Sequence, residues 1–121
     1  MKRVLVVEDN AANLRLVSDI LARAGYAVLS ATDARAGIAL ATAEVPDLIL
    51  MDIQLPGMDG LTATAHLKGD PRTAGIPVVA LTAHAMTGDE QRILDAGCDR
   101  YVSKPIRYRR FLEVVAEILG D

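Results

Sequence analysis

Polar side chains that could do chemistry follow four separate apolar runs of this sequence. Glu8 and Asp9 follow VLVV, Asp52 follows LILM, Thr82 follows VVAL, and Lys104 follows YVS. If these runs are parallel strands of one α/β sheet, their carboxyl ends meet at one edge, where such sheets bind ligands. We therefore predict one pocket with three carboxylates, a hydroxyl and an ammonium group. This set suits a divalent metal ion, an acceptor aspartate and a bound anion.

The three acidic residues Glu8, Asp9 and Asp52 predict a magnesium site. Two like charges about 4 Å apart repel by about 4 kcal/mol at an effective dielectric constant of about 20, so three carboxylates together favour a cation. Oxygen ligands select a hard ion, and Mg²⁺ suits an incomplete protein cage because it keeps several waters. Alternatively, Glu8 and Asp9 only cap the following helix, whose dipole favours acidic residues. The third carboxylate favours the metal site.

Asp52 could also be a nucleophile toward phosphorus, because carboxylates form aspartyl phosphates when a metal ion and a lysine balance the charge. Lys104 is placed to supply that charge, although an ordinary surface lysine is the alternative. Pro105 after it permits a cis peptide bond that would aim Lys104 into the pocket. Thr82 suits a strand in any case, but at a strand end its hydroxyl could reach a phosphoryl oxygen.

The segments that must position these residues alternate between strand-like and helix-like patterns. Buried apolar runs predict strands at residues 3–7, 26–30, 47–51, 76–81 and 101–102. Helical spacing and cap residues predict five helices. The first covers residues 13–25, with Asn10 as its cap, and the second covers 34–43. The third ends near residue 69, the fourth runs from a capping box of Thr87 and Glu90 to about residue 97, and the last covers 107–119. The pattern is a (βα)5 α/β fold without internal repeats or linkers.

Composition narrows the class of protein. The chain has 121 residues, which predicts one domain over residues 1–121. Its net charge of −3 disfavours nucleic acid and anionic membranes as partners and favours a protein. No apolar run approaches a membrane span and no signal region is evident, so we predict a soluble, cytoplasmic protein. The single cysteine, Cys98, lies in an apolar AGC segment and is predicted to be a buried structural thiol.

The segments VLVVEDN, LILMDIQLPGMDG, VVALTAHA and YVSKPI resemble, in order, the signature segments of the response-regulator receiver domain. This resemblance covers essentially the whole chain and implies a flavodoxin-like, doubly wound sheet of strand order 2-1-3-4-5. It implies that Asp52 is the phospho-acceptor, which takes its phosphoryl group from a sensor histidine kinase or a histidine phosphotransferase. Glu8, Asp9, Asp52 and the backbone carbonyl of Gln54 would hold Mg²⁺, and Lys104 would pair with the phosphoryl group.

The resemblance also implies a switch. Phosphorylation adds negative charge and acceptor oxygens, which would recruit Thr82 and let Tyr101 turn inward. The face of the fourth helix, fifth strand and fifth helix would then change shape for a downstream protein partner. Arg107, Arg109 and Arg110 begin the last helix, where the helix dipole disfavours cations. They indicate either a binding role for this face or simply a solvated helix start.

Within the family pattern, several positions bear on specificity. Gln54 and His84 occupy places that tune loss of the phosphoryl group, without indicating its lifetime. The spacing of Asn10 and Asn13 and the MTGDE segment resembles stand-alone regulators of bacterial cell-cycle and developmental kinases. By analogy, kinase contacts would lie on the first helix, at Asn13, Arg15, Leu16 and Asp19.

Other classes of protein fit less well. A phosphatase of the haloacid dehalogenase type needs a second aspartate two residues after the nucleophile, and this position is Gln54. A flavodoxin-like electron carrier needs a hydroxyl- and glycine-rich first loop for the flavin phosphate, which Glu8 and Asp9 would repel. A receiver-like scaffold that acts without phosphorylation stays open, because a complete site need not be used.

Overall fold

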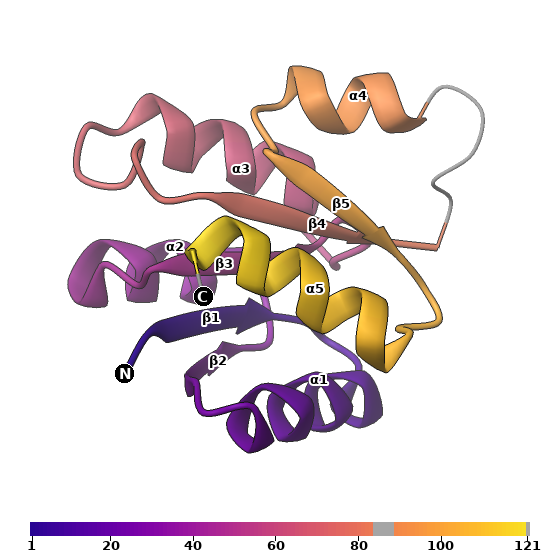
Figure 1. Cartoon of the computed structure of the whole chain (residues 1–121). Coiled ribbons are helices and arrows are strands. Elements are labelled where there is room, and N and C mark those ends of the chain that lie inside the picture. Colours follow the sequence, from indigo (N-terminus) through magenta and orange to yellow (C-terminus); the bar gives the residue numbers. More distant parts are fainter. Residues whose placement is uncertain (84–88, 121) are drawn as a thin grey trace.

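The computed structural model describes residues 1–83 and 89–120 of the chain. In this part, a parallel sheet is covered by helices on both faces (Figure 1). The strands are β1 (Arg3–Val7), β2 (Ala27–Ala31), β3 (Leu48–Asp52), β4 (Val78–Thr82) and β5 (Arg100–Ser103). The helices are α1 (Ala11–Arg23), α2 (Ala34–Glu44), α3 (Gly60–Gly69), α4 (Asp89–Asp95) and α5 (Tyr108–Leu119).

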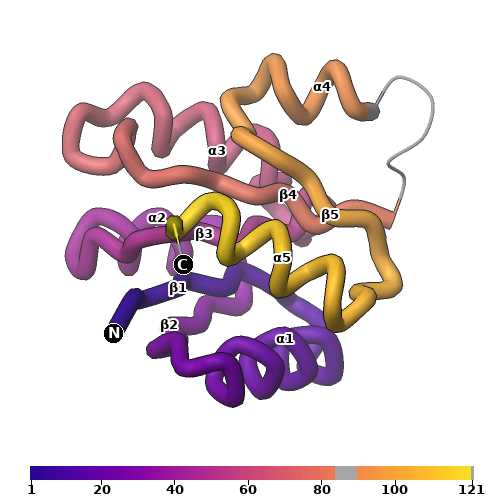
Figure 2. Tube along the Cα trace, viewed as in Figure 1, coloured from indigo at the N-terminus to yellow at the C-terminus, as the bar shows by residue number. Residues whose placement is uncertain are grey.

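The strand order is β2-β1-β3-β4-β5, and every neighbouring pair is parallel. The predicted (βα)5 fold and its strand order are therefore confirmed. The chain winds from β1 outward to β2 and then back across β1 to β3, as the tube in Figure 2 lets the eye follow. This reversal places the carboxyl ends of β1 and β3 side by side, where open α/β sheets bind ligands.

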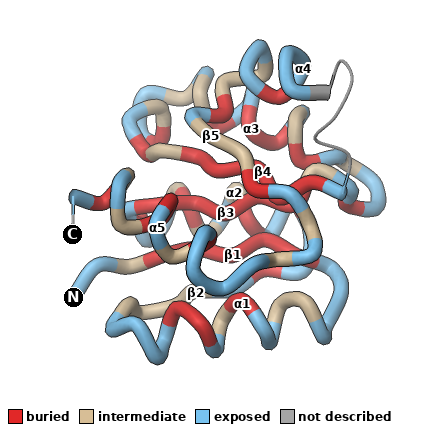
Figure 3. The backbone as a smooth tube through the Cα atoms, turned by 45° about the vertical axis from the view of Figure 1, so that its right-hand side comes forward, coloured by how far each residue is buried: buried red, intermediate tan, exposed pale blue. Residues whose placement is uncertain are grey.

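The core lies in two layers because side chains of a strand alternate between the faces of the sheet. Val4 and Val6 of β1 pack with α1 and α5, whereas Leu5 and Val7 pack with α2 and α3. The central strands β1, β3 and β4 are buried through the middle of the molecule, whereas the edge strands β2 and β5 are only partly buried and the outer faces of the helices are exposed (Figure 3). Gly37 lies within the continuous helix α2 for a packing reason, since a Cβ there would lie 2.7 Å from Cγ2 of Val7.

The element boundaries lie within two residues of the predicted ones, and those of β1 are as predicted. Asp52 and Thr82 are the last residues of β3 and β4, because the parallel ladder extends through their backbones. Asn10 caps α1, as predicted, so the helix begins at Ala11. Arg107 is the N-cap of α5 and makes no side-chain capping hydrogen bond. No helix in the described ranges is long and apolar enough to cross a membrane.

Three predictions fall wholly or partly outside the described ranges. They concern His84, the Thr87 capping box and the first three residues of the MTGDE segment. The predicted helix to which Thr87 belongs is present as α4 from Asp89 onward.

Candidate functional site

The three acidic residues predicted to act together lie at the carboxyl ends of β1 and β3. Val7 and Met51 are partners in the ladder, so Glu8 directly follows one strand beside the end of the other. One carboxylate oxygen from each of Glu8, Asp9 and Asp52 lies within 4.8 Å of the others. Glu8 and Asp52 are buried and Asp9 is exposed. The cluster therefore has a buried floor and an open side.

Lys104 reaches this cluster from the end of β5. Its Nζ lies 3.0 Å from Oδ2 of Asp52 and 3.3 and 3.4 Å from the two carboxylate oxygens of Glu8. The backbone N–H of Lys104 donates to the carbonyl of Thr82 at 2.7 Å, and the Lys104–Pro105 peptide bond is cis. The structure thus brings together the ammonium group and two of the carboxylates that the sequence predicts to meet.

Thr82 and Gln54 complete the surroundings of Asp52. Thr82 is fully buried at the end of β4, one residue beyond Leu81, which pairs with Asp52 in the ladder. The backbone N–H of Gln54 donates to Oδ1 of Asp52 at 2.9 Å, while the Gln54 side chain is exposed. The predicted roles of the Thr82 hydroxyl and of the Gln54 carbonyl stay predictions.

The two buried carboxylates have different electrostatic environments. Burial, together with the neighbouring Asp52, raises the pKa of Glu8 to about 7, although Asn13 and Lys104 oppose the rise. Burial would also raise the pKa of Asp52, but hydrogen bonds with Glu8, with the Gln54 N–H and with Lys104 outweigh it and hold that pKa below its usual value. Asp52 is therefore the carboxylate that stays ionised at neutral pH, as a nucleophile must be.

Lys104 is held in its charged form. Burial alone would lower its pKa, but hydrogen bonding and the charges of Asp52 and Glu8 raise it above the usual value. A fixed positive charge beside an ionised carboxylate is the arrangement that stabilises an incoming anion.

The donor set fits a hard divalent cation. Glu8, Asp9 and Asp52 offer oxygen ligands alone, and their combined charge exceeds that of Lys104. Mg²⁺ is typically held by one or two carboxylates and retains waters and phosphate oxygens. The exposed side at Asp9 leaves room for those additional ligands.

Sequence reasoning missed two features that adjoin this site. The side-chain amide of Asn13 donates to Oε1 of Glu8 at 3.1 Å, although the sequence predicts Asn13 to contact the kinase. A cleft of about 400 Å³ opens between α1 and residues 104–106, and its lining includes Glu8, Leu16 and Ile106. No sequence signal marks this cleft, since it forms only where α1 and the 104–106 segment approach each other.

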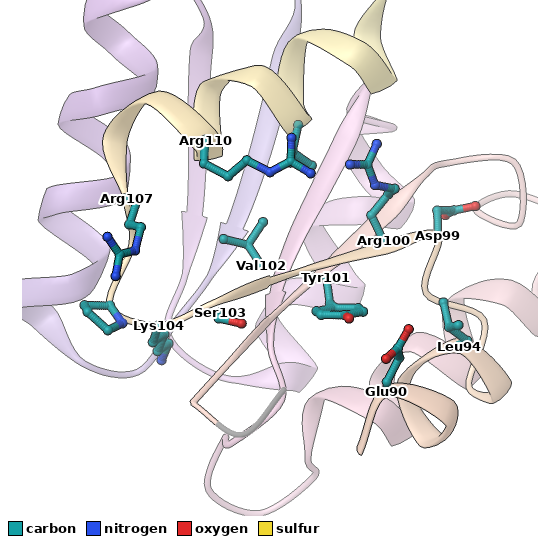
Figure 4. A pocket seen from close by; sticks show the side chains of 12 residues that line it. Glu90, Leu94, Asp99, Arg100, Tyr101, Val102, Ser103, Lys104, Arg107 and Arg110 are labelled. Carbon is teal, nitrogen blue, oxygen red and sulfur yellow. The ribbon is translucent and has the colours of Figure 1, made fainter. Parts of the chain in front are cut away.

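A second cleft, of about 560 Å³, lies on the face formed by α4, β5 and α5 (Figure 4). Tyr101 lines it on the side of Glu90, and partial desolvation together with the Glu90 carboxylate raises the pKa of Tyr101. Arg107 and Arg110 line its opposite side. Tyr101 is therefore half-buried in the cleft wall, on the surface where the sequence predicts the downstream partner to bind.

Known proteins are similar to this chain over nearly its whole length. The family model of the response regulator receiver domain matches residues 4–116. The chain is 47% identical over 120 residues to the polar-differentiation response regulator DivK of Brucella anthropi, covering 99% of this chain and 98% of that protein. DivK of Brucella ovis gives the same identity and coverage.

Similar solved structures include two from other bacteria. The receiver domain of the sensor histidine kinase PA1611 of Pseudomonas aeruginosa, described with a magnesium ion in its active site cleft, has a TM-score of 0.92 at 32% identity and covers 99% of this chain and 98% of its own. The chemotaxis protein CheY4 of Vibrio cholerae has a TM-score of 0.93 at 27% identity and covers 98% of this chain and 99% of its own.

Proposed function

Because this chain belongs to the response-regulator receiver family of two-component signalling, we propose that Asp52 accepts a phosphoryl group from a phosphohistidine. The donor is a sensor histidine kinase or a histidine phosphotransferase. The observation that carries this proposal is the contact of the Lys104 ammonium, at 3.0 Å, with a buried carboxylate whose pKa is held low. A purely structural ion pair would not require two further carboxylates at the same sheet edge.

In the proposed reaction, an oxygen of Asp52 attacks phosphorus while the bond from phosphorus to the histidine nitrogen breaks. The electron pair stays on the imidazole nitrogen. Lys104 moves from its carboxylate partners to a phosphoryl oxygen, and the Thr82 hydroxyl donates to another. Water later attacks the same phosphorus, the bond from phosphorus to the Asp52 oxygen breaks, and inorganic phosphate leaves while the carboxylate is restored. In this proposal the protein assists only its own phosphorylation and dephosphorylation and acts on no other substrate.

Mg²⁺ would be held by Glu8, Asp9, Asp52 and the backbone carbonyl of Gln54. Bound there, it would neutralise negative charge on the transferring group. The support for this ligand set is the cluster of oxygen donors within 4.8 Å. The receiver structure from Pseudomonas aeruginosa that carries magnesium is similar over nearly the whole chain.

We propose that two surfaces serve two kinds of partner. The kinase or phosphotransferase would contact the exposed side chains of Arg15, Leu16 and Asp19 on α1, beside the smaller cleft at the acidic site. The downstream protein would bind the cleft of α4, β5 and α5, where Arg107 and Arg110 suit a partner with carboxylates. Exchange of the α1 side chains for those of another receiver should change kinase preference, and unchanged preference would contradict this assignment.

The output switch belongs to the same proposal. A phosphoryl group on Asp52 would draw the Thr82 hydroxyl toward it, and Tyr101 would move from the cleft wall toward the interior. We also propose that residues 1–121 form one receiver domain and that the protein acts in the cytoplasm. The rival function is a receiver-like scaffold whose contacts do not depend on phosphorylation.

The decisive test is intact mass after incubation with acetyl phosphate and Mg²⁺. The wild-type protein should gain one phosphoryl group, while Asp52→Asn and a sample with EDTA should gain none. A histidine-phosphorylated donor provides a second route to the same adduct. If neither donor gives an adduct under rapid quenching, the scaffold function replaces this proposal.

A further inference from the structure

We propose that Asn13 is a positioning residue of the acceptor site, whose side-chain amide holds the carboxylate of Glu8 in place for metal binding and phosphoryl transfer. This inference rests on the proposed function of Asp52 and Glu8. It assigns to Asn13 an inward role instead of the kinase contact that its place on the first helix predicts.

The backbone of Asn13 is fixed in the first turn of α1. Its N–H donates to the Oδ1 of Asn10, the helix cap, at 2.9 Å, and the next N–H, of Leu14, donates to the Asn10 carbonyl. The half-buried side chain then reaches across to the end of β1, where Nδ2 lies 3.1 Å from Oε1 of Glu8. By contrast, Arg15 and Leu16 on the same helix are exposed.

The hydrogen bond from Asn13 matters because the other partner of Glu8, the Lys104 ammonium, also contacts Asp52. Oε1 of Glu8 accepts from both Asn13 and Lys104, whereas Oε2 accepts from Lys104 at 3.4 Å. When Lys104 turns to a phosphoryl oxygen, Glu8 loses the hydrogen bonds from that ammonium. The Asn13 amide remains, so the carboxylate keeps its orientation through the reaction.

Hydrogen-bond partners of metal-ligating groups typically change metal affinity by about 10- to 100-fold when they are removed. We therefore expect loss of the Asn13 amide to weaken metal binding by roughly tenfold and to slow phosphorylation of Asp52 even from a small donor. A residue that only contacts the kinase would affect neither, because acetyl phosphate does not dock on α1.

The test compares Asn13→Leu, which keeps a similar shape without the amide, with Ala12→Leu, which adds the same side chain at the neighbouring exposed position. Mn²⁺ affinity is measured by electron paramagnetic resonance, and the rate of the acetyl phosphate reaction by intact mass. Asn13→Leu should raise the dissociation constant for Mn²⁺ about tenfold and slow the reaction, while Ala12→Leu should match the wild type. Thermal unfolding with EDTA shows whether each variant is folded. If Asn13→Leu does not fold, Asn13→Ser takes its place, because the serine side chain is too short to reach Glu8.

A double-variant cycle links the effect to Glu8. In a Glu8→Ala background, which lacks the acceptor, Asn13→Leu should cause no further change in Mn²⁺ affinity. An unchanged affinity in Asn13→Leu, an equal loss in both backgrounds, or a defect confined to transfer from the kinase would overturn the proposal. If the wild type is never phosphorylated, the proposed function fails, yet the Mn²⁺ measurements still test the link between Asn13 and Glu8.

Discussion

Gly60, the first residue of α3, packs directly on the backbone of Asp52. A Cβ at position 60 would collide with the carbonyl oxygen of Asp52 and lie 2.7 Å from Cα of Ile53. The N–H of Gly60 also donates to the carbonyl of Ile53 at 3.3 Å. Glycine is therefore required for α3 to begin this close to the proposed phospho-acceptor.

Gly60→Ala is expected to destabilise the protein by about 1 to 3 kcal/mol, because the added carbon meets backbone and not a flexible side chain. It should also slow the acetyl phosphate reaction by displacing the end of β3. Gly69→Ala, at the other end of the same helix, is the matched control, since a Cβ there has no neighbour within 4 Å. Urea unfolding measures the stability of both variants, and equal stability would contradict the packing of Gly60 on the backbone of Asp52.

Lys104→Met should reveal the unbalanced charge of the site. The apolar stem is retained, but Glu8 and Asp52 lose the ammonium that contacts both of them. We expect a loss of about 3 kcal/mol in the free energy of unfolding at pH 8 with EDTA, as for other broken buried ion pairs. Mg²⁺ should restore more stability to this variant than to the wild type, and the exposed Lys2→Met provides the control. Identical unfolding midpoints for Lys104→Met and Lys2→Met would show that the Lys104 ammonium does not stabilise the folded protein.

Stability of the metal-free protein should fall as the pH rises, because of Glu8. Burial raises its pKa in the folded protein from 4.5 to about 7, so the folded state binds this proton more tightly than the unfolded state. The contribution of Glu8 is then fully present below pH 4.5 and is lost as the pH rises through 7. We expect a loss of about 2 kcal/mol after allowance for solvent screening.

Glu8→Gln tests that pH dependence, because the amide does not titrate. In EDTA, its free energy of unfolding should stay level between pH 5 and pH 8 while that of the wild type declines. Chemical denaturation at four or five pH values measures the difference. Parallel pH profiles for the two proteins would show that another group causes the decline.

Cys98 should react slowly with thiol reagents in the native protein. The side chain is buried, its Sγ lies 3.8 Å from Oγ1 of Thr64, and burial raises the pKa of the thiol. Since the thiolate is the reactive form, we expect modification by Ellman's reagent to be roughly a hundredfold slower than in denaturant. Rapid modification of Cys98 without loss of the native circular dichroism would show that burial does not protect this thiol.

Much of the site was readable from the sequence because parallel strands bring their carboxyl ends to one edge. Glu8, Asp52 and Lys104 each follow or end an apolar run, and their predicted contact is observed. The strand ends were less readable. Asp52 and Thr82 belong to the ladders themselves, since backbone pairing continues past the last apolar side chain.

The sequence by itself determined the α/β fold, the strand order by family resemblance, and the residue types that gather at one sheet edge, because apolar runs and cap residues encode local structure. Tertiary structure alone decided the rest. Asn13 could be a surface residue until α1 packs beside β1, and Gly60 an ordinary helix start until α3 meets Asp52. Which carboxylate stays ionised depends on burial and on hydrogen-bond partners from distant segments, and these exist only once the chain has folded.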